Sequence, residues 1–165
     1  MTIYTIGYEG TSLMTFIKCL HINHINVVLD VRLYPFSRKP GFSQKALQTA
    51  LNQANISYRH FVELGCPADI RDNYKLDNNW NKYVQLYNAY LDANPEILKP
   101  ILPYLSSLRC ALMCFEADAN FCHRSLIAKR VMSLYPDCVM ENLMPQRAKQ
   151  SSQKESAAQS RLAFV

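Results

Sequence analysis

The chain has 165 residues, of which 49% are hydrophobic and 19% are charged. This length and composition predict one folded domain with a substantial core, and they argue against a two-domain enzyme, a disordered chain or a small disulfide scaffold. No run approaches the ~18 consecutive apolar residues of a membrane span, and Met1 to Leu20 lacks the pattern of a signal peptide. We therefore expect a cytoplasmic protein without a membrane partner, whose six cysteines are reduced thiols.

The formal net charge is +5, and much of the excess lies at the C-terminus. Residues 145–165 contain four basic residues and one acidic residue, with almost no apolar periodicity. We expect a folded domain at residues 1–144 and a flexible basic tail at residues 145–165. Such a tail could add weak, salt-sensitive attraction to nucleic acid, or it could simply be a solubilising terminus.

The N-terminal half predicts three strands separated by two helices. A β-prone run at residues 3–6 precedes a helix that begins near Leu13, and an apolar strand at residues 26–31 precedes a helix capped by Ser43 that ends near Ala54. A third strand at residues 56–61 leads into a turn at residues 63–67. The strand at 26–31 is apolar on both faces, which is typical of a parallel sheet covered by helices.

The C-terminal half begins with a longer crossover. It contains a helix at residues 79–91 and a helix from Pro95 to about Leu108, which Pro100 and Pro103 should kink or shorten. A central strand at residues 109–115, a helix at 121–134 and a last strand at 137–141 follow. The alternation predicts an α/β fold, a single three-layer domain with a mostly parallel central sheet of about five strands, and leaves the strand order open.

Polar residues follow the predicted strands, at the sheet edge where parallel α/β proteins bind ligands. The strongest candidate among them is Cys122, early in the helix at 121–134. The positive end of that helix and the nearby Arg124 both favour thiolate over thiol. The alternative is that Cys122 is a small buried hydrophobe, the more common fate of free cysteines.

A metal site is the weaker hypothesis for the same region. Cys114, Cys122, His123 and either His60 or Glu116 supply thiolate, imidazole and carboxylate groups. No Cys-x2-Cys pair occurs, and adjacent helical residues such as Cys122 and His123 point about 100° apart. We expect no metal and no cofactor. The nucleotide-binding and hydrolase motifs GxGxxG, Walker loop and GxSxG are also absent.

The loop at residues 30–43 mixes three cations with three aromatic side chains. This composition suits neutralising a phosphate while stacking on a base. It equally suits a stiff surface loop in which Arg32 pairs with Asp30 or Glu63 in a buried network. Asp30 is costly to bury alone, and its best partner would be Arg32 or Arg124.

Motifs spread over nearly the whole domain resemble the bacterial and archaeal family called domain of unknown function 488. They are Thr5-Ile6-Gly7-Tyr8, Asp30-Val31-Arg32 with Pro35, Ser37-Arg38 and Phe42, then Glu63-Leu64-Gly65, and finally Cys114, Glu116 and Cys122-His123-Arg124. Cys66-Pro67 departs from the further glycine of many members. The resemblance implies an α/β domain and a shared set of site residues, without a reaction.

The first hypothesis is an enzyme that acts on an anionic, phosphate-bearing or nucleotide-like substrate at a strand-end pocket. Cys122 is the candidate nucleophile or redox thiol, and His123 or Glu116 is the candidate proton carrier. The substrate-binding candidates are Tyr8, Asp30, Arg32, Ser37, Arg38, Phe42, Glu63 and Arg124.

Two other hypotheses belong to different classes. A nucleic-acid-binding or regulatory module without catalysis would stack Tyr34, Phe36 and Phe42 on bases and meet phosphates with Arg38, Lys39 and the tail. A purely structural network of buried Asp, Arg and Glu would instead unfold on loss of Asp30 or Arg124.

Overall fold

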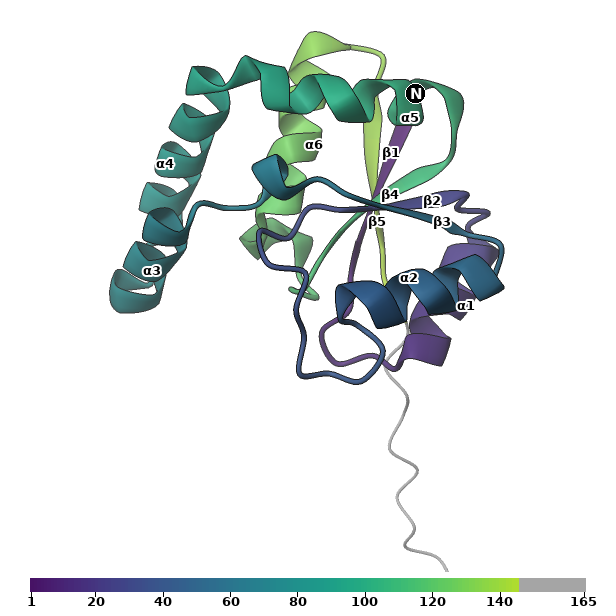
Figure 1. Ribbon diagram of the computed structural model, residues 1–165. Coiled ribbons are helices and arrows are strands. Elements are labelled where there is room, and N and C mark those ends of the chain that lie inside the picture. The colour runs from purple at the N-terminus through teal and green to yellow at the C-terminus, as the bar shows by residue number, and fades with distance from the viewer. Residues whose placement is uncertain (146–165) are drawn as a thin grey trace, which may run out of the picture.

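A computed structural model describes residues 1–145 and contains one five-stranded sheet (Figure 1). The strands run parallel throughout, in the order β3-β2-β4-β1-β5. Their bounds are β1 Thr2–Gly7, β2 Val27–Asp30, β3 Ser57–His60, β4 Cys110–Cys114 and β5 Val139–Leu143. The three-layer α/β prediction is confirmed.

Helices cover both faces of the sheet. α1 (Leu13–Ile22) and α2 (Gln44–Gln53) lie on one face, while α4 (Trp80–Ala93), α5 (Leu102–Ser107) and α6 (His123–Leu134) lie on the other, with α3 (Ala68–Asp77) beside α4 (Figure 1). Strand residues alternate between two cores: Val28 packs with the α1 and α2 side chains, and Leu29 packs with those of α4 and α6. Strands that are covered by helices on both faces therefore have apolar residues at consecutive positions.

Two parts of the long crossover differ from the prediction. α3 is a helix that the pattern did not indicate, because Ile70 is its one buried residue and its apolar periodicity is weak. The helix expected from Pro95 divides into a 3-10 segment, η2 (Pro95–Ile101), and α5. Pro100 and Pro103 lack the N–H groups that would continue a single α-helix.

The carboxyl ends of β1, β2 and β4 lie side by side. Gly7 pairs with Cys114, and Asp30 pairs with Met113. The backbone N–H groups of Tyr8 and Glu9 both donate to the carbonyl of Phe115. A Cβ on Gly7 would lie 1.8 Å from the carbonyl oxygen of Glu116, so only glycine lets the loop after β4 pass this closely. The loop that carries Glu116 is thus fixed against β1.

Within residues 1–145, no helix is long and apolar enough to cross a membrane. The tail predicted at residues 145–165 lies outside the described residues apart from Pro145. The domain boundary at residue 144 therefore stays a prediction.

Candidate active site

Cys122 lies at the N-terminus of α6, as the capping residue and not within the first turn. Its backbone is extended, with φ −141° and ψ 138°, and its side chain makes no capping bond to the helix. The carbonyl of Cys122 accepts hydrogen bonds from the backbone N–H and the hydroxyl of Ser125. The sulfur thus lies at the positive end of the helix without capping it.

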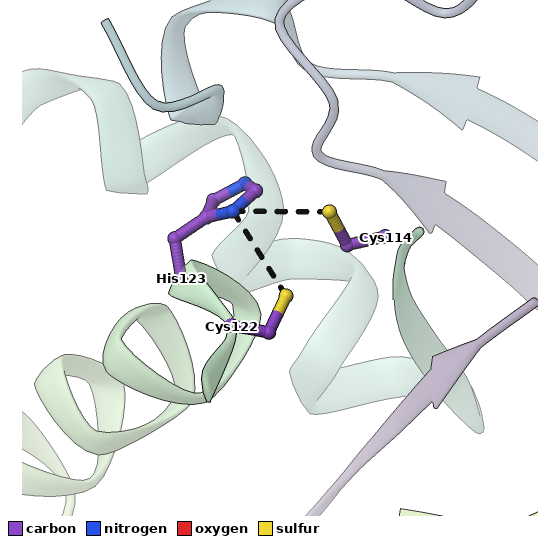
Figure 2. A group of neighbouring side chains, drawn as sticks. All are labelled: Cys114, Cys122 and His123. Atoms are coloured by element: carbon purple, nitrogen blue, oxygen red, sulfur yellow. Dashed lines mark hydrogen bonds between the residues drawn. The ribbon is translucent and has the colours of Figure 1, made fainter. Parts of the chain in front are cut away.

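Three chemically reactive side chains converge at this point (Figure 2). Nδ1 of His123 lies 3.8 Å from the sulfur of Cys114, at the end of β4, and 4.0 Å from the sulfur of Cys122. The opposite nitrogen, Nε2, lies 2.7 Å from the carbonyl oxygen of Val31 and must donate to it, because a carbonyl only accepts. The Val31 carbonyl therefore fixes the imidazole so that Nδ1 faces both sulfurs.

Glu116 completes the group from the loop between β4 and α6. A hydrogen bond of 3.0 Å joins its Oε2 to the sulfur of Cys122, and the two groups share one proton. Burial, and then the negative charge on Cys122, raise the pKa of Glu116 to about 7. At neutral pH this carboxyl can hold or release a proton beside the sulfur.

The pKa values of the two cysteines in the group are shifted in opposite directions. Burial opposes ionisation of Cys122, but hydrogen bonds from Cys114 and His123 and the positive charges of His123 and Arg124 outweigh it and hold its pKa well below the usual value. The hydrogen bond that Cys114 shares with Cys122, followed by burial, raises the pKa of Cys114. These opposite shifts favour Cys122 as the thiolate and Cys114 as its neutral hydrogen-bond donor.

All four residues of the group line a cavity of about 160 Å³. Cys66 also lines this cavity, but burial raises the pKa of its thiol to about 11. Aromatic residues dominate the walls: Tyr34, Tyr74, Trp80, Tyr83, Phe115 and Phe121. Tyr34 and Phe121 are 60% and 53% exposed, so the cavity reaches the protein surface.

Arg71 also lines the cavity and was missing from the predicted site. It belongs to α3, the helix that the sequence pattern did not indicate, and no motif marks it. Its guanidinium lies over the ring of Tyr34, with 5.4 Å from Cζ to the ring centroid. The Nε atom is buried and has no hydrogen-bond partner among the described residues.

Asp30 and Arg32 form a buried ion pair at the end of β2. Nε and Nη2 of Arg32 donate to the Asp30 carboxylate over 2.8 and 2.6 Å, and Nη1 donates to the Tyr8 hydroxyl and the Phe42 carbonyl. Asp30 also accepts from the Tyr58 hydroxyl. Arg32 is thus the predicted partner of Asp30, and its contacts favour the structural interpretation of this pair over anion binding.

The remaining predicted residues lie in three different settings. Phe42 is completely buried and stacks on Tyr8 at 4.3 Å, so it presents no face to a ligand. Arg124 is buried and donates to Thr5 Oγ1 and to the carbonyls of Glu116 and Ala117, which positions the loop after β4. Three predicted residues do not line the cavity. Ser37 forms hydrogen bonds within its own loop, and Arg38 and Glu63 are exposed.

The donor set of this group could also hold a metal ion. The ligand atoms of Cys114, Cys122 and His123 all lie within 4.8 Å of one another. Two sulfurs and one imidazole nitrogen suit zinc, and the contact of His123 with Val31 is typical of ring nitrogens opposite a metal. The expectation that Cys122 and His123 point about 100° apart is wrong, because it assumed that both residues are helical and Cys122 precedes the helix. The predicted absence of a metal stays a prediction.

Comparison with known proteins gives one match. The family described as domain of unknown function DUF488 matches residues 12–131, which include the whole cysteine, histidine and glutamate group. No curated protein and no solved structure matches the chain.

Proposed function

This chain belongs to the DUF488 family, whose description assigns no reaction, and we propose from its site that it is an enzyme with Cys122 as the nucleophile. Its substrate is a small anion bound in the cavity above the sulfur. The observation that carries the proposal is the position of Cys122: at a helix N-terminus, in the lining of a cavity, 3.0 Å from a carboxyl group.

Each neighbour of Cys122 has a distinct part in the proposed reaction. The thiolate donates an electron pair to an electrophilic carbon of the substrate and forms a carbon–sulfur bond. The bond to the leaving group breaks with its electron pair, and protonated Glu116 gives its proton to that group. A second nucleophile, such as water, then attacks the same carbon, releases the thiolate and returns a proton to Glu116.

His123 supports this cycle by electrostatics. Burial works against a charged imidazole, but the hydrogen bond and the charge of Cys122 raise the pKa of His123. A positive imidazole next to the sulfur stabilises the thiolate in the resting enzyme. Both residues line the cavity, but Glu116 is half-buried whereas His123 is buried and held by the Val31 carbonyl, so Glu116 is better placed to exchange protons with a substrate. A reduced nucleophile also requires a reducing compartment, and we place the protein in the cytoplasm.

The test is selective alkylation of the folded, chelator-washed protein with iodoacetamide at neutral pH. Mass mapping would follow each of the six cysteines separately. We expect Cys122 to react much faster than Cys19 and Cys66, whose pKa values are raised by burial. A Cys122→Ser variant should lose the fast phase and retain the slow ones.

Two results would contradict the proposal. Slow reaction of Cys122, at the rate of Cys66, would make it an ordinary buried thiol. Stoichiometric zinc that survives purification and protects Cys122, Cys114 and His123 together would instead assign the same atoms to a metal centre. Added zinc that merely slows alkylation of a reactive Cys122 is compatible with the nucleophile.

A further inference from the structure

Arg71 is a cation in the cavity wall, and none of residues 1–145 is an anionic partner for it. No carboxylate of the described residues lies within ion-pair distance of it, in contrast to Arg32, whose guanidinium is engaged on both edges. Its Nε is buried without a hydrogen bond. The Nη nitrogens are not among the buried atoms and form no hydrogen bond with a described residue, so they are the atoms available to pair with an anion in the cavity.

The wall next to Arg71 is built from flat side chains. Trp80 and Tyr83 are stacked at 4.7 Å, Tyr74 packs edge-on against both, and Phe121 packs against Trp80 at 5.6 Å. All four of these residues line the cavity. Aromatic walls favour a planar, apolar ligand group through stacking and edge-to-face contacts.

The cavity volume limits the size of the ligand. Its 160 Å³ is close to the ~150 Å³ of an engineered apolar cavity that holds one benzene molecule. It is well below the ~300 Å³ at the lower end of pockets for drug-sized ligands. One six-membered ring with an anionic substituent therefore suits this space, whereas most of a nucleotide would have to extend beyond it at the surface near Tyr34 and Phe121.

We infer that Arg71 and the aromatic wall form a binding subsite for a small anion that carries one planar ring. The guanidinium pairs with the carboxylate or phosphate, and the ring lies among Tyr74, Trp80 and Tyr83. The inference rests on the proposed function only in treating this anion as the substrate class of Cys122. It refines the expected phosphate-bearing or nucleotide-like substrate to a single-ring anion.

The subsite can be tested by fluorescence, because Trp80 is the only tryptophan of the chain and lines the cavity. Titration with benzoate should change the Trp80 emission and saturate. Acetate, which lacks the ring, and benzamide, which lacks the charge, should bind much more weakly. Comparing the affinities for phenyl phosphate and benzoate shows which anionic group the site prefers.

Arg71→Gln should weaken benzoate binding about 10-fold to 100-fold, the usual loss for a charge-assisted hydrogen bond. The matched control is Arg38→Gln, which removes an exposed arginine outside the cavity lining. Native circular dichroism would show that both variants fold. Equal affinity in wild type and Arg71→Gln, or acetate and benzamide binding as tightly as benzoate, would overturn the subsite.

A second readout uses the charge of the alkylating reagent. Iodoacetate is a small carboxylate and iodoacetamide is its neutral analogue, so their rate ratio at Cys122 reports attraction of the anion by Arg71. The rate with iodoacetate divided by the rate with iodoacetamide should be higher at Cys122 than at Cys19 in the same sample. In Arg71→Gln this ratio should fall at Cys122 and stay constant at Cys19. An unchanged Cys122 ratio would contradict the subsite.

The two proposals fail in different ways. A Cys122 that resists both reagents, combined with benzoate binding that depends on Arg71, would refute the nucleophile and retain the subsite. A reactive Cys122 in a protein that does not bind benzoate would refute the subsite and retain the nucleophile.

Discussion

The proton that Cys122 and Glu116 share determines how the site should respond to pH. The pKa of Cys122 lies well below its usual value, and burial raises the pKa of Glu116 to about 7. Below pH 7 the pair therefore holds one proton in the hydrogen bond between Oε2 and the sulfur. Above pH 7 that proton is lost, and the sulfur no longer shares it.

We predict that the alkylation rate of Cys122 rises as the pH increases through about 7 and then levels off. Glu116→Gln should remove this step, because an amide does not titrate. The measurement is the iodoacetamide rate at Cys122 across the pH range, with Cys19 as the internal reference. Burial raises the pKa of Cys19, so its rate should still be increasing where Cys122 has levelled off. A step that persists in Glu116→Gln would assign the titration to another group.

The sequence identified some of these residues and missed others for physical reasons. Cys122, His123 and Glu116 could be found because they follow a strongly apolar strand in sequence. Arg71 could not, because nothing in a weakly amphipathic segment shows which side chain faces a distant strand end. The sequence also did not show that Cys122 has an extended backbone and that the helix begins only at His123. This conformation brings the Cys122 sulfur next to the His123 ring.

At the scale of elements, the end of β2 is held by one buried charge pair. Asp30 is fully buried, and its carboxylate joins Arg32 on one side to the Tyr58 hydroxyl of β3 on the other. Arg32 continues the connection to Tyr8 after β1 and to Phe42 before α2. The pair thus fixes the loop that begins at Val31, whose carbonyl orients His123.

Asp30→Asn should destabilise the fold by about 3–5 kcal/mol, because it leaves the buried guanidinium of Arg32 without a counter-charge. Chemical denaturation of the variant would measure the loss. The matched control is Asp72→Asn, which breaks the exposed pair with Lys75 and should leave the midpoint unchanged. An Asp30→Asn variant as stable as wild type would show that the network contributes little to folding.

The elements differ in how strongly the sequence specified them. β4 was predictable because residues 110–113 are buried on both faces and leave a continuous apolar run. α3 buries one residue, so its helical pattern is almost absent, and it is held by packing on α4. The division at Leu102 follows from Pro100 and Pro103, where the sequence indicated a kink and the structure places a 3-10 segment.

At the scale of the whole molecule, strand order decides which loops share the site. The pairing of β4 with both β1 and β2 brings together residues that are far apart in sequence: Val31, Arg71, Cys114 and Cys122. Local apolar patterns contain no information about this order, because every buried parallel strand has the same composition. The sequence therefore predicted the class of fold, while the site that we propose at this edge depends on a strand order that the sequence left open.

The arrangement also bears on the rival hypothesis of a nucleic-acid-binding module. That hypothesis needs Tyr34, Phe36 and Phe42 as a stacking platform, yet Phe42 is completely buried and Arg71 lies over Tyr34. Phe36 is the one of the three rings that no other ring or cation among the described residues contacts, and it is 74% exposed. A single ring gives at most one stacked base.

We therefore predict that single-stranded oligothymidylate binds the full chain only in the ~10⁻⁴–10⁻⁶ M range of non-specific electrostatic binding. The affinity should fall steeply between low and physiological salt, because the net charge of +5 is its main source. Phe36→Ala should leave it unchanged, since stacking contributes little. Fluorescence anisotropy with a labelled oligonucleotide measures all three properties. Nanomolar binding that Phe36→Ala weakens at least about tenfold, the usual effect of losing one stacked base, would instead support the nucleic-acid-binding module.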